Sequence, residues 1–173
     1  MMNIRISSPR TLRISCALVA LIVAASAGPA FAQTAGGNLG VSATVTENCT
    51  LTTDPVAFGN VDVTTGAAVP GVGGIAVTCT NGVAWSADAD AGAGTGASIL
   101  DRRMADGANL LSYQLYTEPT RTEIWGDGED GETIDDEGTG SEQVVPIYAR
   151  VIAAQSDVPS GTYADTVVVT VTY

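Results

Sequence analysis

The sequence TYADTVVVTVTY, residues 162–173, predicts the fold more directly than any other part of the chain. Val167, Val169 and Val171 are separated there by single residues, so in an extended strand they point to the same side. One apolar face with a period of two is typical of a β-strand that packs against a core. The opposite orientation would bury several threonine hydroxyls, which is unfavourable. We therefore expect an all-β protein with these three valines facing inward.

The composition after residue 32 supports this class. Those 141 residues contain 17 Val, 20 Thr and 6 Ile but only 6 Leu, and β-branched residues favour strands over helices. The same part holds 19 Gly and 5 Pro, which divide it into the short runs typical of a β-sandwich or β-barrel. Besides 162–173, the predicted strands are residues 39–46, 56–61, 74–80, 83–90, 110–116, 122–125 and 144–152.

The first 32 residues have the features of a secretory signal peptide. Three arginines precede an apolar stretch, residues 14–27, and Ala30 and Ala32 supply a small-x-small cleavage pattern. An apolar stretch of this length is shorter than the roughly 20 residues that span a bilayer, so no direct membrane insertion is expected. The mature chain is expected to begin at Gln33 and to be exported.

Two cysteines follow the predicted signal peptide, Cys49 and Cys79. Exported proteins fold in an oxidising compartment, where an isolated pair of cysteines usually forms a disulfide. Two buried free thiols are the alternative. The position of Cys79 on the same predicted strand face as Ile75 and Val77 favours a bridge between strands near the start of the sandwich.

The charge of the chain excludes several classes of function. The sequence has no His and no Lys, and after residue 32 it has four Arg against 19 acidic residues, a net charge of −15. Histidine-dependent catalytic triads and imidazole metal sites are therefore absent. Nucleic acid and anionic lipid are not expected partners, because phosphate binding requires clustered Lys or Arg.

Other polar and aromatic residues have structural interpretations. The acidic stretch 126–142 is predicted to be a solvated loop, since from Asp127 the ligand and glycine positions do not match a calcium-binding EF-hand loop. Asp88 and Asp90 lie two apart on one predicted strand and are assigned to its polar face rather than to a glycosidase pair. Trp85 and Trp125 are predicted core residues, and one of Arg102 and Arg103 is predicted to form a structural ion pair.

The segment 33–47 differs from the other predicted strands. After a glycine-rich start, Leu39, Val41, Ala43 and Val45 alternate with small or polar residues. This pattern indicates a strand on a flexible leader. From the residues alone, an ordinary edge strand of its own domain is the simplest interpretation.

Several short motifs follow one another along the chain in a characteristic order. They are Phe58-Gly59, Val77-Thr78-Cys79-Thr80, Arg103-Met104, Leu111-Ser112-Tyr113-Gln114-Leu115-Tyr116, Trp125-Gly126-Asp127-Gly128, Pro146-Ile147-Tyr148-Ala149-Arg150, Gly161-Thr162-Tyr163-Ala164-Asp165-Thr166-Val167 and the terminal Thr172-Tyr173. In the order and spacing of these motifs, from about residue 39 to residue 173, the chain resembles the spore coat protein U domain family, which includes pilins of archaic chaperone–usher pili.

The resemblance implies an incomplete immunoglobulin-like β-sandwich that lacks its last strand and is completed by a donor strand from a neighbouring subunit. In such a family a periplasmic pilus chaperone first fills the groove, and an outer-membrane usher assembles the subunits into a fibre. The implied organisation is a signal peptide (1–32), a donor-strand extension (33–47) and a pilin domain (48–173). The implied donor residues are Leu39, Val41, Ala43 and Val45, and the implied acceptor groove includes Val167, Val169 and Val171.

The sequence therefore predicts a structural subunit of a surface pilus that supports attachment and biofilm formation. The expected partners are the chaperone, the usher and other pilin subunits, and no enzymatic activity or cofactor is expected. A spore- or cell-coat protein that packs into a surface layer is the main alternative. A secreted carbohydrate-binding module is less well supported, because the sequence lacks an evident aromatic platform.

Overall fold

The computed structural model describes residue 28 and residues 31–173, and the chain divides into two units, Met1–Ser42 and Ala43–Tyr173. The described residues of the first unit are exposed and form no helix or strand. Most of the predicted signal peptide, residues 1–32, lies outside the described residues. No helix in the described part of the chain is long and apolar enough to cross a membrane.

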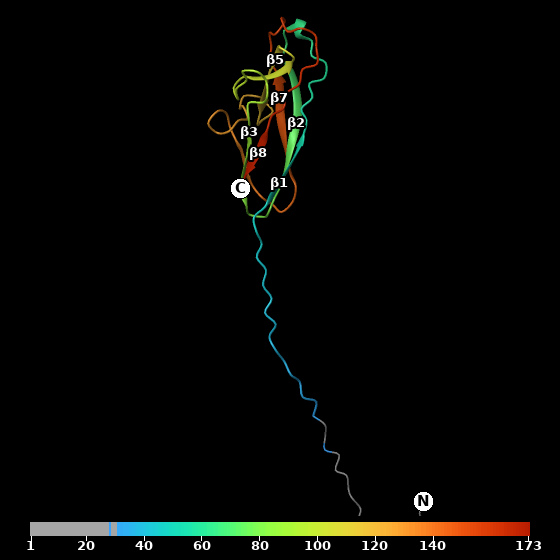
Figure 1. Cartoon of the computed structure of the whole chain (residues 1–173), viewed down its shortest axis with the longest axis vertical. Helices are drawn as coiled ribbons and strands as arrows, with labels where there is room; N and C mark the ends of the chain where they lie inside the picture. The colour runs from blue at the N-terminus through green and yellow to red at the C-terminus, as the bar shows by residue number, and fades with distance from the viewer. Residues whose placement is uncertain (1–27, 29–30) are drawn as a thin grey trace, which may run out of the picture. The chain divides into compact units, whose positions relative to one another are not determined.

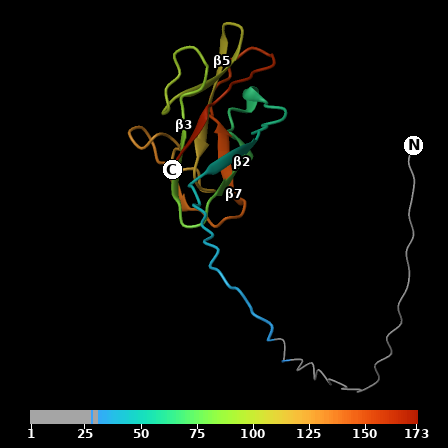
Figure 2. The ribbon, with the colours of Figure 1, turned by 60° about the horizontal axis from the view of Figure 1, so that its bottom comes forward.

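The second unit consists of two antiparallel sheets. Figures 1 and 2 place β3 on one side of this unit and β2 and β7 on the other. The five-stranded sheet contains, in spatial order, Cys49–Asp54 (β1), Val69–Cys79 (β2), Gln143–Val151 (β7), Asn109–Tyr116 (β5) and Arg102–Asp106 (β4). The three-stranded sheet contains Ile134–Glu137 (β6), Ala84–Ala89 (β3) and Val169–Thr172 (β8), and a short 3-10 helix spans Val63–Thr65 (η1).

The core lies between the two sheets and follows the predicted alternation. On β2, Ile75 and Val77 are buried while Ala76 between them is only partly buried. Strand β3 repeats this alternation, with Trp85, Ala87 and Ala89 buried. Strand β7 contributes a third row of buried side chains, and Trp125 fills the space between the sheets. The indole N–H of Trp125 donates a 2.9 Å hydrogen bond to the carbonyl of Ala87. The buried set includes Ile75, Val77, Cys79, Trp85, Ala87, Ala89, Tyr113, Leu115, Trp125, Ile147 and Ala149.

Cys49 and Cys79 form a disulfide, as the sequence predicts. The two residues are direct partners in the antiparallel ladder between β1 and β2. The bridge therefore joins neighbouring strands of one sheet and attaches the edge strand β1 to β2.

Four predicted strands are wrong in part or whole, and one of them, residues 39–46, forms no strand in this chain. Residues 56–61 form no strand, although Val56 and Phe58 pack against the core, because Gly59 has a left-handed φ of 65° and no strand lies alongside. Residues 122–125 make only isolated bridges through Ile124 and Trp125. Within residues 162–173, ladder pairing begins only at Val169.

Three observed strands were not predicted. Strand β1 is rich in threonine, β4 begins with two arginines, and β6 lies within the acidic stretch 126–142 that was predicted to be a loop. Each lies at the edge of its sheet, where a strongly apolar pattern is not required. The acidic side chains of β6 fit its edge position, because charges discourage pairing with other chains.

Candidate functional site

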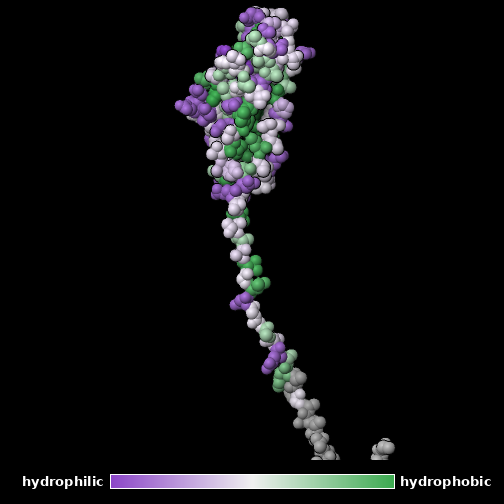
Figure 3. Space-filling model, viewed as in Figure 1, coloured by the Kyte–Doolittle hydropathy of each residue, from purple (hydrophilic) through white to green (hydrophobic). Residues whose placement is uncertain are grey.

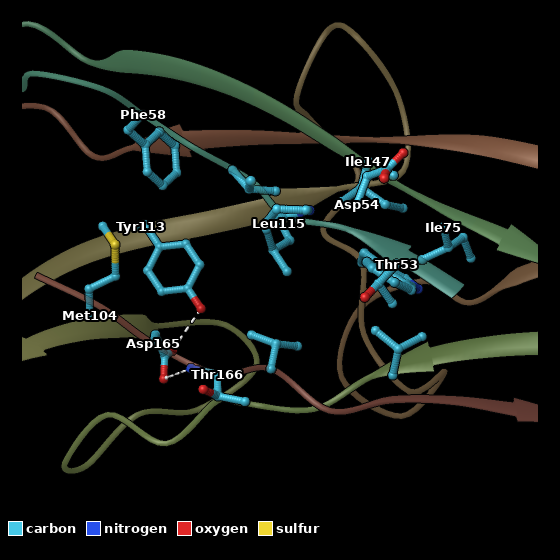
Figure 4. A pocket seen from close by; sticks show the side chains of 16 residues that line it. Thr53, Asp54, Phe58, Ile75, Met104, Tyr113, Leu115, Ile147, Asp165 and Thr166 are labelled. Atoms are coloured by element: carbon cyan, nitrogen blue, oxygen red, sulfur yellow. Dashed lines mark hydrogen bonds between the residues drawn. The ribbon is translucent and has the colours of Figure 1, made fainter. Parts of the chain in front are cut away.

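A groove opens between the two sheets, beside the inner faces of β1 and β8. It encloses a cavity of about 300 Å3, and Figure 4 shows its side chains converging from both sheets. Figure 3 shows hydrophobic residues gathered on the surface where Figure 1 labels β8. The lining is mainly apolar and comprises Thr53, Asp54, Pro55, Val56, Phe58, Gly74, Ile75, Met104, Tyr113, Leu115, Trp125, Ile147, Asp165, Thr166, Val167 and Val169.

Strand β8 borders the groove with an unpaired edge. In the described structure β8 pairs only with β3. The N–H of Asp90 donates to the carbonyl of Val168 at 3.1 Å, so the backbone groups of Val168 face β3. Since these groups alternate in direction along a strand, the N–H and C=O groups of Val169 and Val171 point away from β3. The same two residues turn their side chains toward the core.

Strand β1 provides a second unpaired edge. It is the terminal strand of its sheet, and the N–H of Thr80 on the β2 side donates to the carbonyl of Asn48 at 2.9 Å. By the same alternation, the backbone groups of Leu51 and Thr53 point away from β2. Leu51 also packs against the core, and Thr53 lines the groove. The groove thus has one free strand edge from each sheet, and the backbone N–H and C=O groups along these edges could pair with an added strand.

A polar cluster closes the groove where the chain approaches β8. The hydroxyl of Tyr113 donates a 2.7 Å hydrogen bond to Asp165, and the N–H groups of Ala93 and Thr166 each donate to the same carboxylate at 2.8 Å. Burial is the main reason that the pKa of Tyr113 is raised above its usual value, and the hydrogen bond to Asp165 adds to the effect. Gly92 passes so close to Asp165 that an added Cβ atom would clash with the carboxylate.

The structure places the four predicted donor residues outside any strand of this chain. Leu39, Val41 and Val45 have exposed fractions of 88%, 87% and 83%, and Ala43 is exposed as well. Of the predicted groove residues, Val167 and Val169 line the cavity, whereas Val171 packs against the core farther along β8. The β1 side of the groove could not be predicted from sequence, because apolar and polar residues alternate only weakly along β1.

The other polar residues singled out by sequence have structural positions. Arg103 forms an ion pair with Asp101, as was predicted for one of the two arginines. Arg102 is fully buried and binds no carboxylate: its guanidinium donates to the carbonyls of Ala89 and Asp90 and to Gln114 Oε1. No group of three or more potential metal ligands occurs in the described part of the chain.

Taken with the fold, the two free edges define the class of this protein: an immunoglobulin-like β-sandwich with an open groove where a further strand would lie. The chain belongs to the Spore Coat Protein U domain family, whose family model matches residues 35–170. This confirms the resemblance seen in the sequence motifs.

Two known proteins are similar to this chain. Protein U of Myxococcus xanthus is 35% identical, over 92% of this chain and 98% of the relative. Among solved structures, one similar chain is in the complex titled CsuC–CsuE chaperone–tip adhesion subunit pre-assembly complex, from the archaic chaperone–usher Csu pili of Acinetobacter baumannii. It matches with a TM-score of 0.55 and 20% identity, over 75% of this chain. This chain spans 40% of the length of that solved chain, and the similarity shows a shared fold.

Proposed function

We propose that this chain is a structural subunit of a surface pilus of the chaperone–usher type and that its subunits are linked by donor-strand exchange. In this proposal residues 39–45 of one copy fill the groove between β1 and β8 of the next. One observation carries the proposal: the chain contains both an unfilled groove with two free strand edges and an exposed segment with the matching apolar period of two.

The energetics of this exchange are favourable. Leu39, Val41 and Val45 expose nearly all of their apolar surface, and burying such a side chain stabilises by roughly 1 to 3 kcal/mol. Ala43 contributes less because it is small. Backbone hydrogen bonds along the free edges of β1 and β8 would add affinity, while the alternating side chains would set the register.

The start of β1 limits how the donor segment can leave its own domain. The hydroxyl of Thr80 lies 3.4 Å from the carbonyl of Thr46 and accepts a hydrogen bond from the N–H of Asn48 at 3.2 Å. These contacts hold residues 46–48 beside the end of β2. The anchored Asn48 is three positions after Val45, and three residues of extended chain span at most about 11 Å. Consecutive subunits joined in this way would therefore lie close together.

The open groove also implies partners before assembly. An unpaired edge beside an apolar surface is prone to aggregation, so a periplasmic chaperone would protect it until an outer-membrane usher joins the subunits. The signal peptide, residues 1–32, would export the chain to the periplasm, and the finished pilus would lie on the cell surface. We propose attachment and biofilm formation as the role of this fibre.

A coat protein is the second candidate, favoured by the family's description and by the 35% identity to Protein U. In that function copies pack into a surface layer without exchanging strands. Chaperone and usher genes beside the gene for this chain would favour the pilus.

Deletion of residues 39–45 distinguishes the two candidates. Cells that export the intact chain together with its chaperone and usher should carry thin fibres in electron micrographs. The deletion should abolish these fibres, while the truncated chain still accumulates with its chaperone. Normal fibres or a normal surface layer from the deleted chain would contradict the proposal.

A further inference from the structure

The outer face of the five-stranded sheet carries an aromatic row that the groove does not use. Val72 on β2 is the ladder partner of Tyr148 on β7, which is in turn the partner of Tyr116 on β5. The residues on either side of Tyr148 are buried in the core, so this row points away from it. Val72 is 54% exposed, and Val144, farther along β7, is 66% exposed. Tyr148 is half-buried, and Tyr116 is only 4% exposed because Arg150 lies over its ring, so the accessible part of this row is Val72, Val144, Tyr148 and the arginine side chains.

Two arginines lie on this row. The guanidinium carbon of Arg121 lies 5.6 Å from the ring centre of Tyr148, and that of Arg150 lies 5.2 Å from the ring centre of Tyr116. Arg150 also donates a 2.8 Å hydrogen bond to the hydroxyl of Tyr116. Cation–π contacts at these distances hold the positive charges against the sheet.

Neither arginine is neutralised by a carboxylate in the described part of the chain, where the one ion pair joins Arg103 to Asp101. Arg121 instead donates to the carbonyls of Ala149 and Pro119. The carboxylate of Glu118, three residues before Arg121, accepts hydrogen bonds from the hydroxyl of Thr120 and from backbone N–H groups of its own turn, chiefly that of Thr122. These contacts lower the pKa of Glu118 to about 2.

The opposite outer face of the sandwich has the complementary charge. On the three-stranded sheet Asp135 and Glu137 of β6 are ladder partners of Ser86 and Ala84, residues that alternate with the buried side chains of β3. Asp88 lies on the same outer side by the same alternation. All four arginines after residue 32 lie outside this sheet. One face of the molecule is therefore cationic and aromatic, and the other is acidic.

We propose that the outer face around Tyr148 is a docking surface for the acidic outer face of a second copy of this chain. Arg121 and Arg150 of one copy would meet Asp135 and Glu137 of the other, with Val72 and Val144 excluding water at the margin. This contact joins two different surfaces, so it repeats from copy to copy and produces lateral rows. It is separate from the groove between β1 and β8.

The charge distribution favours a second copy as the occupant. The net charge of −15 after residue 32 makes copies of this chain repel one another in most orientations. Attraction is expected only in the orientation that places the arginines of one copy against the acidic face of another. The acidic face is present on every copy and reaches high local concentration wherever the chain is displayed in an array. An acidic polysaccharide could also bind the two arginines, and the experiment below distinguishes such binding from self-association.

The test uses the mature chain with its groove occupied by the chaperone, or the chain alone if it is monodisperse without one. Self-association is followed by light scattering at fixed ionic strength. Arg150→Glu should weaken lateral association by roughly tenfold or more, since it places like charges opposite each other. Arg103→Glu is the matched control, because it makes the same change in net charge at a site already paired with Asp101. It should change association by less than about threefold. The variant that combines Arg150→Glu with Glu137→Arg exchanges the sign of both faces and should recover association.

Near-ultraviolet circular dichroism of each variant would show that the core is intact, and Glu137→Arg alone, at an exposed position, should also weaken association. Equal effects of Arg150→Glu and Arg103→Glu, or no recovery in the combined variant, would overturn the proposal. So would a mature chain with its groove occupied that binds polygalacturonate but does not associate with itself. Fibres are scored separately by electron microscopy, so a failure of donor-strand exchange would be distinguished from a failure of this contact.

Discussion

The hydroxyl of Tyr113 donates a 2.7 Å hydrogen bond to Asp165, and this bond connects the floor of the groove to the segment that leads into β8. Asp165 also accepts the N–H of Ala93, so the same carboxylate holds three parts of the chain together. The pair therefore fixes the position of one free edge relative to the opposite sheet.

Replacing Tyr113 with Phe should destabilise the fold by roughly 1.5 to 3 kcal/mol, because it removes a hydrogen bond from a buried phenol to a partly buried charged acceptor. Tyr163→Phe is a matched control, since its hydroxyl donates to the carbonyl of Pro159 in an exposed loop and should matter less. Chemical denaturation of the exported protein measures both changes. A larger loss in Tyr163→Phe than in Tyr113→Phe would contradict this assignment.

The raised pKa of Tyr113 also predicts a dependence on alkaline pH. In the folded protein the phenol keeps its proton above the pH, about 10, at which an unfolded tyrosine loses it. The contribution of Tyr113 to the free energy of unfolding is therefore fully present below about pH 10 and decreases as the pH rises above that value. Tyr113→Phe should flatten this decrease between about pH 10 and 12 in denaturation experiments. An unchanged slope would show that the hydroxyl is not buried as described.

Arg102 should be essential for the stability of the end of the sandwich. Its guanidinium donates to the carbonyls of Ala89 and Asp90 at 3.0 and 2.8 Å and to Gln114 Oε1 at 2.6 Å. Arg102→Met would remove the donor to the carbonyls of Ala89 and Asp90 and one of the two donors to Gln114 Oε1, which also accepts the N–H of Leu115, at about 3 kcal/mol or more. Arg103→Gln, which breaks an exposed ion pair, should lower stability by about 1 kcal/mol or less. Thermal melting of both variants would reveal the difference, and similar values would be inconsistent with the buried network.

The disulfide between Cys49 and Cys79 should contribute about 3 to 4 kcal/mol, the value expected for a loop of 30 residues. Replacing both cysteines with serine should therefore strongly reduce the amount of exported subunit. Mass spectrometry without reductant should show the native chain two hydrogens lighter than its reduced form. Two free thiols in periplasmic protein would refute the bridge.

The part of the fold that could be predicted from sequence is the part that the core determines. Val169 and Val171 alternate because one face of β8 is buried, and the same rule identified β2 through Ile75 and Val77. Edge strands depend instead on which neighbour is available. The threonines of β1 and the acids of β6 carry no strong strand signal, so their pairing with β2 and β3 could not be read from local pattern.

The groove illustrates the same limit. Its β8 side was predictable from the valines, whereas Phe58, Met104 and Tyr113 reach it from segments far apart in the sequence. The alternation of residues 39–45 was equally visible, yet the segment forms no strand in this chain. A sequence pattern shows that a face needs a partner but does not say which molecule supplies it.

The open groove should make the mature chain unstable in isolation. Without a chaperone, the chain should aggregate, be degraded or associate into fibres, since the free edges of β1 and β8 border exposed apolar surface. Size-exclusion chromatography of periplasmic protein, produced with and without a chaperone, measures this. A stable and monodisperse monomer without any chaperone would indicate that the chain closes its own groove.

Donor-strand exchange is tested most directly by comparing Val41→Asp with Ser42→Asp in chaperone-bound subunits that are allowed to assemble. Both positions are exposed before assembly, and neighbouring residues of a strand face opposite ways. In the groove, Asp at position 41 would lose its water without gaining a partner, at several kcal/mol per subunit contact. We expect Val41→Asp to bind the chaperone normally but to form no fibres, and Ser42→Asp to form fibres at nearly the normal rate. Equal assembly by the two variants, or the reverse order, would contradict donor-strand exchange through this face of the segment.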